Sequence, residues 1–181
     1  MKDIVKKILR DIKVELADEF DKNFERKGFF DQAWSPTKHT KSTGSLMMRT
    51  GALRRSIKAS VSGSQIKFTS SEPYASLHND GGAVKVTVKM KRFFWAMHRV
   101  ALGKSHSTAS GRKRTKKAAE RYNKEAAQWK SLALKKVGTT INVTKRQFIG
   151  WHNSLTPGIK HIVETRLDEA LADIAKKYGG R

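Results

Sequence analysis

Long amphipathic patterns at the two ends of the chain constrain the fold most. Near the N-terminus, apolar residues recur at steps of three and four: Ile4, Val5, Ile8, Leu9, Ile12, Leu16, Phe20 and Phe24. This spacing predicts an amphipathic helix of about six turns that ends near Gly28. A similar series predicts a last helix: Ile159, Ile162, Val163, Leu167, Leu171, Ile174 and Tyr178. The sequence "TPG" opens that helix, with Thr156 as N-cap and Pro157 in the first turn.

Between the two helices the apolar pattern changes to period two. Residues 54–61 and 66–68 alternate on either side of "SGS", which predicts a β-hairpin. Val84 to Met90 alternates again and predicts a third strand, and "TTINV" at 139–143 predicts a short fourth one. Helical spacing returns from Phe93 to Ala101, where Gly103 is expected to end the helix, and again at 119–133. Residues 31–50 are expected to form an irregular loop, with Trp34 folded back on the core.

This order of elements, α-β-β-β-α-α-β-α, predicts one α+β domain over residues 1–181. We expect a small, mostly antiparallel sheet, packed by the N- and C-terminal helices. Residues 103–138 are predicted to form a basic insertion, made of an arm at 103–117 and the helix that follows it.

The charge of the chain is high and unevenly spread. Thirty-eight Lys and Arg against 16 Asp and Glu give a formal net charge of +22. Between Lys85 and Arg146 there are 18 basic and two acidic residues, so +16 of the charge lies in that third. Such a field attracts polyanions, either nucleic acid or an acidic protein surface, and charge by itself does not choose between them.

The arm "GKSHSTASGRKRTKK", Gly103 to Lys117, concentrates this charge. It has no acidic residue, and its one apolar side chain is Ala109. Because it buries too little surface to offset the entropy of ordering it, we expect it to be mobile in the free subunit. Six side chains are candidates for contact with a polyanion such as DNA: Lys104, Arg112, Lys113, Arg114, Lys116 and Lys117. A solvated loop that keeps the protein soluble is the alternative.

Motifs for catalysis and metal binding are missing from the sequence. There is no Cys, no G-x-S-x-G, no H-E-x-x-H, no Walker sequence and no Gly-rich dinucleotide loop. The six His residues are scattered. We therefore predict no enzyme activity, no cofactor and no metal site. No apolar run approaches a membrane span, and the N-terminus does not resemble a signal peptide, so a soluble protein without a membrane partner is expected.

The stretch "PYASLHNDGG", Pro73 to Gly82, contains the one local pair suited to acid–base chemistry, His78 and Asp80. A small hydrolase that uses His78 is the remote alternative. Turn formation explains the stretch better, because Asn, Asp and Gly tolerate left-handed backbone. We expect Asn79 or Asp80 to cap or turn the chain into the next strand, and His78 to make a local hydrogen bond.

Three blocks together resemble one known family. "LMMRTGALRRSI" at 46–57, "YASLHNDGG" at 74–82 and "RQFIGW" at 146–151 are similar to blocks of the phage virion-morphogenesis, or tail-completion, family of Mu-like prophages. The resemblance covers most of the chain, and the blocks occur in the same order. The residues that carry it are Thr50, Gly51, Leu53, Tyr74, Ala75, His78, Asn79, Gly81, Gly82, Arg146, Phe148 and Gly150.

The resemblance implies a structural protein of the virion that completes the tail or forms part of the neck. It implies a homo-oligomeric ring at the head-proximal end of the tail, which docks on tail-tube or head-connector proteins. The expected location is the virion, and the host cytoplasm during assembly. A basic nucleic-acid-binding protein remains the alternative, since Arg and Lys are interleaved with Trp95, Tyr122 and Trp129. Against it, these aromatic residues have the spacing of a helical core.

Overall fold

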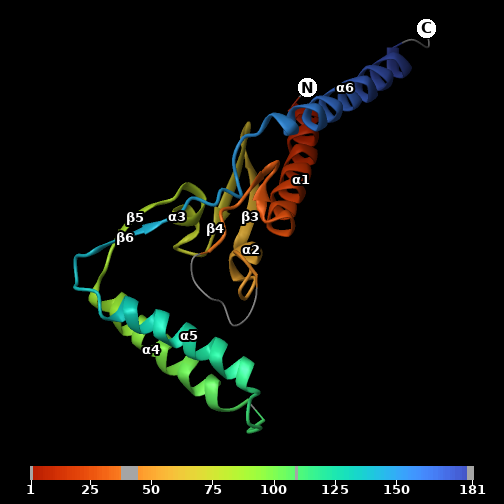
Figure 1. Cartoon of the computed structure of the whole chain (residues 1–181). Helices are drawn as coiled ribbons and strands as arrows, with labels where there is room; N and C mark the ends of the chain where they lie inside the picture. Colours follow the sequence, from red (N-terminus) through yellow and green to blue (C-terminus); the bar gives the residue numbers. More distant parts are fainter. Residues whose placement is uncertain (1, 38–44, 109, 179–181) are drawn as a thin grey trace. The chain divides into compact units, whose positions relative to one another are not determined.

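The computed structural model of the chain describes residues 2–37, 45–108 and 110–178, and it divides into two compact units (Figure 1). The first unit comprises Met1–Trp34, Gly51–Asn79 and Arg146–Arg181, and the second comprises Ser35–Thr50 and Asp80–Lys145. Each unit combines helices with antiparallel strands, so the predicted α+β class is confirmed. Among the described residues, no helix is both long and apolar enough to cross a membrane.

Two long helices of the first unit pack on each other. Helix α1 spans Lys2–Arg26, as the apolar spacing predicts, and α6 spans Thr156–Tyr178. The Nε of Arg166 in α6 donates to Asp11 in α1 over 2.6 Å. Figure 1 shows the C-terminal half of α6 extending past α1. That half of α6 therefore has an exposed surface within its own unit.

The start of α6 differs from the prediction. Thr156 already has helical backbone angles, φ −58° and ψ −47°, so it is not an N-cap. A short 3₁₀ turn, η1, spans Asn153–Leu155 before it, and the Nδ1 of His152 accepts from the N–H of Ser154 over 3.2 Å. His152 caps this helix start, because the 3₁₀ turn places the first free N–H groups upstream of Thr156.

The predicted hairpin is confirmed as β3 (Ile57–Ser62) and β4 (Gln65–Ser70), which pair antiparallel. Alternate residues are half-buried, and the ring of Phe68 lies 4.9 Å from that of Phe20 in α1. Strand β3 begins at Ile57 and not at Arg54, because Ala52–Ser56 form the short helix α2. The buried Ser56 hydroxyl donates to the carbonyl of Leu53 over 2.7 Å, which closes that turn.

A second, very short ladder follows α1. Strands β1 (Gly28–Phe29) and β2 (Gln32–Ala33) pair and lead to Trp34. The Trp34 ring is 8% exposed and lies 5.7 Å from the Phe24 ring, so its predicted return to the core is confirmed. Residues 38–44 of the predicted loop at 31–50 lie outside the described residues.

In the second unit, β5 (Gly82–Lys85) pairs antiparallel with β6 (Thr140–Val143), the predicted fourth strand. The prediction of a strand from Val84 to Met90 is wrong beyond Lys85. Val86 is still buried, at 1% exposed, as the alternation predicts. At the next residue, the Oγ1 of Thr87 accepts from the N–H of Met90 over 3.2 Å and caps a helix. A side-chain cap thus ends the extended run that the alternation suggested.

Helices α4 (Val88–His106) and α5 (Lys116–Ala133) lie side by side in the second unit (Figure 1). Phe94, Ala101, Tyr122 and Ala126 are buried in this helical hairpin. The predicted helix end at Gly103 is wrong, because α4 continues to His106. A glycine inside a helix costs about 1 kcal/mol relative to alanine. Burial of Ala101 and Ser105 on either side of Gly103 offsets that cost.

The strands of the described residues form three two-stranded antiparallel sheets, β1–β2, β3–β4 and β5–β6. The antiparallel pairing follows the prediction, but the single sheet that we expected is divided. The hairpin β3–β4 belongs to the first unit, and β5–β6 belongs to the second. The assignment of the whole chain to one domain with an insertion at 103–138 stays a prediction.

Candidate functional site

Asn79 joins two of the sequence blocks in the first unit. It belongs to the short helix α3 (Ala75–Asp80), and its Oδ1 accepts from the backbone N–H groups of Phe148 and Ile149, each over 3.0 Å. Next to it, the N–H of Arg146 donates to the carbonyl of His78 over 2.7 Å. One side chain therefore fixes the backbone of a segment that lies about 70 residues further along the chain.

Asn23 of α1 holds the same segment. Its side chain is fully buried, its Nδ2 donates to the carbonyl of Phe148 over 3.2 Å, and its Oδ1 accepts from the N–H of Phe30 over 3.0 Å. The Nε1 of Trp34 adds a bond of 2.6 Å to the carbonyl of Gln147. We call the contacts of Asn23, Trp34 and Asn79 with residues 146–149 the asparagine junction.

The sequence prediction did not include Asn23. Asn23 lies between Phe20 and Phe24 on the apolar stripe of α1, where a polar residue is unusual. That position could have indicated a buried hydrogen-bonding role, because polar groups inside a core need partners. The Phe148 ring, 1% exposed, packs 5.2 Å from the Phe24 ring and completes this core.

The other residues of the three blocks are distributed over several elements and over both units. Gly51 precedes α2, its carbonyl accepts from the N–H of Arg55 over 3.0 Å, and Leu53 is 4% exposed. Thr50 is exposed and belongs to the second unit. Ala75 is buried, and Gly150 has φ +153°, a backbone conformation that favours glycine. These placements do not gather the block residues into a cleft.

His78 lies in α3, two residues before Asp80. Its ring contacts that of Tyr74 edge-on, with 5.6 Å between the ring centres. Burial raises the pKa of the Tyr74 hydroxyl, and the nearby Glu72 adds to that shift. Within the part of the chain that the structure describes, no three His, Asp or Glu side chains could hold a metal ion.

The Asn-Asp-Gly-Gly turn has the predicted left-handed backbone at its two glycines. Gly81 has φ +74° and Gly82 has φ +136°, whereas Asn79 and Asp80 remain in α3. A Cβ atom at Gly81 would lie 3.0 Å from the backbone nitrogen of Lys145. The turn thus needs glycine both for its conformation and for the close approach of another segment.

Arg54 and Arg146 are the charged groups with shifted pKa values in the blocks. The Arg54 Nε donates to Asp21 over 2.5 Å, and a second nitrogen reaches Glu25 over 2.8 Å, which ties α2 to α1. Hydrogen bonds to these carboxylates raise the pKa of Arg54. Burial lowers the pKa of Arg146. Both stay cationic at neutral pH because arginine titrates far above it.

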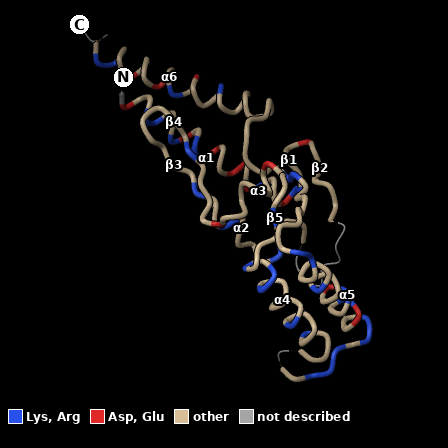
Figure 2. The backbone as a smooth tube through the Cα atoms, turned by 90° about the vertical axis from the view of Figure 1, so that its left-hand side faces the viewer, with Lys and Arg blue, Asp and Glu red and all other residues tan. Residues whose placement is uncertain are grey.

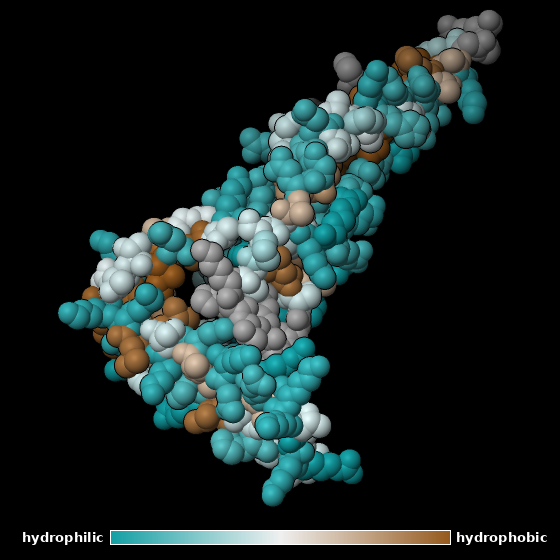
Figure 3. Space-filling view, in the orientation of Figure 1, coloured by the Kyte–Doolittle hydropathy of each residue, from teal (hydrophilic) through white to brown (hydrophobic). Residues whose placement is uncertain are grey.

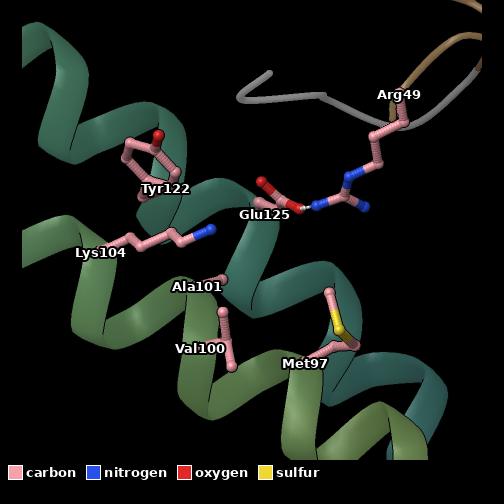
Figure 4. Close-up of a pocket in the computed structure, with 7 residues that line it drawn as sticks. All are labelled: Arg49, Met97, Val100, Ala101, Lys104, Tyr122 and Glu125. Atoms are coloured by element: carbon pink, nitrogen blue, oxygen red, sulfur yellow. Dashed lines mark hydrogen bonds and ion pairs between the residues drawn. The ribbon is translucent and has the colours of Figure 1, made fainter. Parts of the chain in front are cut away.

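A buried carboxylate on α5 of the second unit points toward Arg49 (Figure 4). Glu125 is 4% exposed, pairs with Arg49 from the segment at 45–50, and accepts from Trp129 Nε1 over 3.3 Å. Met97, Val100, Ala101, Lys104 and Tyr122 complete the lining of a cavity of about 20 Å³. A cavity of that volume holds about one water molecule and is too small for a ligand. The pair of Arg49 and Glu125 connects the segment at 45–50 to the helical hairpin.

The six basic side chains of the predicted arm are mostly exposed. Lys104 is in α4, Lys116 and Lys117 form the first turn of α5, and residues 107–115 connect the two helices. Ser107 and Lys113 form an isolated bridge, and the N–H of Arg112 donates to Thr108 Oγ1 over 3.1 Å. The guanidinium of Arg114 stacks 4.5 Å from the centre of the Tyr122 ring. Ala109 lies outside the described residues, and the mobility of the arm stays a prediction.

The two units differ strongly in charge. The second unit has 20 Lys and Arg against three Asp and Glu, a formal charge of +17, and the first has 18 against 13, or +5. Figure 2 shows this basic charge along α4 and into the connection to α5. The aromatic residues of the second unit are partly shielded from solvent, because Tyr122 is buried and Trp129 stacks on Phe94 with 6.0 Å between ring centres.

The comparisons with known proteins give one match. The model of the phage virion morphogenesis family matches residues 2–168, which include all three sequence blocks, the second unit and most of the first. The searches of curated proteins and of solved structures gave no match.

Proposed function

The chain belongs to the phage virion morphogenesis family, and from that premise we propose that it completes the phage tail or builds the neck. In this proposal it forms a homo-oligomeric ring at the head-proximal end of the tail. The family is one of phage structural and assembly proteins and not a known class of enzyme, so the chain has a structural role in the virion.

The family match over residues 2–168 is the observation that carries this proposal. The asparagine junction supports a structural role, because Asn79 of the second block binds backbone groups of Phe148 and Ile149 in the third. Exposed apolar residues of α6 support assembly: Leu171 is 64% exposed and Tyr178 is 70% exposed. Contiguous exposed apolar surface of this kind is typical of protein interfaces.

Deleting the gene in the phage that encodes it tests the role. We expect heads and tails to accumulate unjoined in electron micrographs of the lysate, and a plasmid copy of the gene to restore joined particles. Light scattering of the purified protein, alone and with tail-tube protein, is expected to show an oligomer. Normal joined particles from the deletion would contradict the role in the virion, and monomers under both conditions would contradict the ring.

Contact with DNA is a second candidate function, which the +17 charge of the second unit favours. DNA passes through the neck of a tailed phage, so a basic surface there would meet phosphates. If all six arm charges bind phosphates, the logarithm of the affinity falls with the logarithm of the salt concentration at a slope of roughly −5. Retention of random DNA on the purified protein across a salt series measures that slope.

A further inference from the structure

The C-terminal half of α6 presents an unpartnered apolar seam. Leu167, Leu171, Ile174 and Tyr178 follow one another at steps of four, three and four, and their exposed fractions are 47%, 64%, 52% and 70%. Side chains with this spacing lie on one face of a helix. Brown side chains are visible among the hydrophilic ones on α6 in Figure 3. Three of the four residues follow Asp168, the end of the family match, so the seam is an observation independent of that match.

A second exposed helix face lies on α4, and its residues also follow one another at steps of four and three. Val88, Trp95 and Leu102 are seven residues apart, with exposed fractions of 54%, 36% and 41%. Arg92 and Arg99 come between them, at steps of four and three. We call these five residues the α4 face.

The α4 face is hollowed and cationic. Arg92, Trp95, His98 and Arg99 surround a surface depression of about 430 Å³. The Nδ1 of His98 bonds to the carbonyl of Ala126 over 2.9 Å, which holds one wall of the depression in place. Helix α4 has five Lys and Arg and no acidic residue. A partner of this face therefore needs apolar anchors together with carboxylates.

The α6 seam meets both requirements. Its apolar residues have the spacing of helix-in-groove anchors, and Asp168 lies on the flank of the seam beside Leu167 and Leu171. Glu164 lies one step before Leu167 on the same side. Two α4 faces, in contrast, would bring arginine against arginine. Tyr, Trp and Arg are also the residues that most often dominate binding energy at interfaces.

We propose that the α6 seam of one subunit docks on the α4 face of a second copy of the chain. This inference rests on the proposed ring. A contact between two different surfaces is heterologous, and heterologous contacts generate closed rings when their rotation closes. In the contact, Tyr178 or Leu171 fills the depression beside Trp95, and the arginines of the α4 face pair with Asp168 and Glu164.

Cysteine cross-linking tests the contact, because the natural chain has no cysteine. Two single variants, Trp95→Cys and Leu171→Cys, carry tags of different length and are mixed and oxidised. The expected product is the mixed disulfide dimer, which arises from two separate chains. A matched control pairs Trp95→Cys with Val14→Cys, an exposed apolar position of α1 outside the seam, and is expected to give little mixed product.

Other products of this experiment overturn the contact. Disulfide dimers of Leu171→Cys with itself in place of the mixed product would show that α6 pairs with α6. Oligomers by light scattering without mixed disulfide would leave the proposed ring intact and show that these faces are not its interface. Monomers by light scattering would contradict the ring itself, so the two failures are distinguishable.

A charge exchange tests the occupant of the α4 face. The variant Arg92→Glu/Arg99→Glu is expected to weaken assembly roughly tenfold or more, and adding Glu164→Lys/Asp168→Lys is expected to restore it. Nuclease treatment is expected to leave the oligomer unchanged. Loss of the cross-link on nuclease treatment, or loss of DNA retention with unchanged assembly in Arg92→Glu/Arg99→Glu, would assign the α4 face to nucleic acid and overturn the proposal.

Discussion

The substitution Asn79→Ala removes one oxygen atom on which two backbone N–H groups converge. The N–H groups of Phe148 and Ile149 lie 3.0 Å from it, in a segment where the Phe148 side chain is 1% exposed. Alanine offers no acceptor in its place. The substitution should therefore open the asparagine junction on the α3 side, while Asn23 still holds the carbonyl of Phe148 from the α1 side.

The magnitude follows from the two orphaned donors. A buried donor without an acceptor costs about 1–3 kcal/mol. The Phe148 donor belongs to a buried residue, so its cost lies near the top of that range, whereas Ile149 is half-buried and water can recover part of its loss. We expect the free energy of unfolding to fall by about 3 kcal/mol in total. For a chain of this length, that corresponds to a fall in Tm of roughly 6–12 °C.

Thermal unfolding by circular dichroism measures the fall, and hydrogen exchange of residues 146–150 locates it. Asn123→Ala is the matched control, because Asn123 is exposed on α5 and alanine favours a helix. Asn79→Asp keeps an acceptor oxygen and is expected to lose less stability than Asn79→Ala. Equal Tm values for Asn79→Ala and Asn123→Ala, with unchanged exchange at 146–150, would refute the role of the junction.

Three further predictions follow from the backbone and the charges. Gly81→Val and Gly82→Val should each lower the free energy of unfolding by about 1–3 kcal/mol, because both glycines have positive φ; unchanged melting of both variants would contradict this. Gly103→Ala should raise the free energy of unfolding by about 0.5–1 kcal/mol, since Gly103 is inside α4 and a Cβ there meets no atom within 4 Å. A lower Tm of this variant would count against the continuous helix. Changing five basic residues of the arm to serine should reduce DNA retention and flatten its salt dependence; these are Arg112, Lys113, Arg114, Lys116 and Lys117. Equal retention before and after the change, across the salt series, would show that the arm is only a solvated loop.

The periodicity of the sequence determined the long elements of this protein. The apolar stripe of α1, the alternation of β3 and β4, and the short strand β6 were predictable because each pattern reflects burial of one face of a local element. The division of charge was predictable too, since it needs only the order of the residues. The two glycines of the turn at 79–82 had the backbone that their chemistry suggests.

The tertiary structure decided where competing local signals ended and which distant residues met. Alternation through Val84–Met90 fitted a strand, but the Thr87 cap and the packing of Phe94 and Ala101 in the helical hairpin favoured α4. The contacts of Phe148 with Asn79 and Asn23 join residues 69 and 125 positions apart. A side chain that bonds to a distant backbone leaves no periodic trace in the sequence, because the path of the chain between the two residues brings them together.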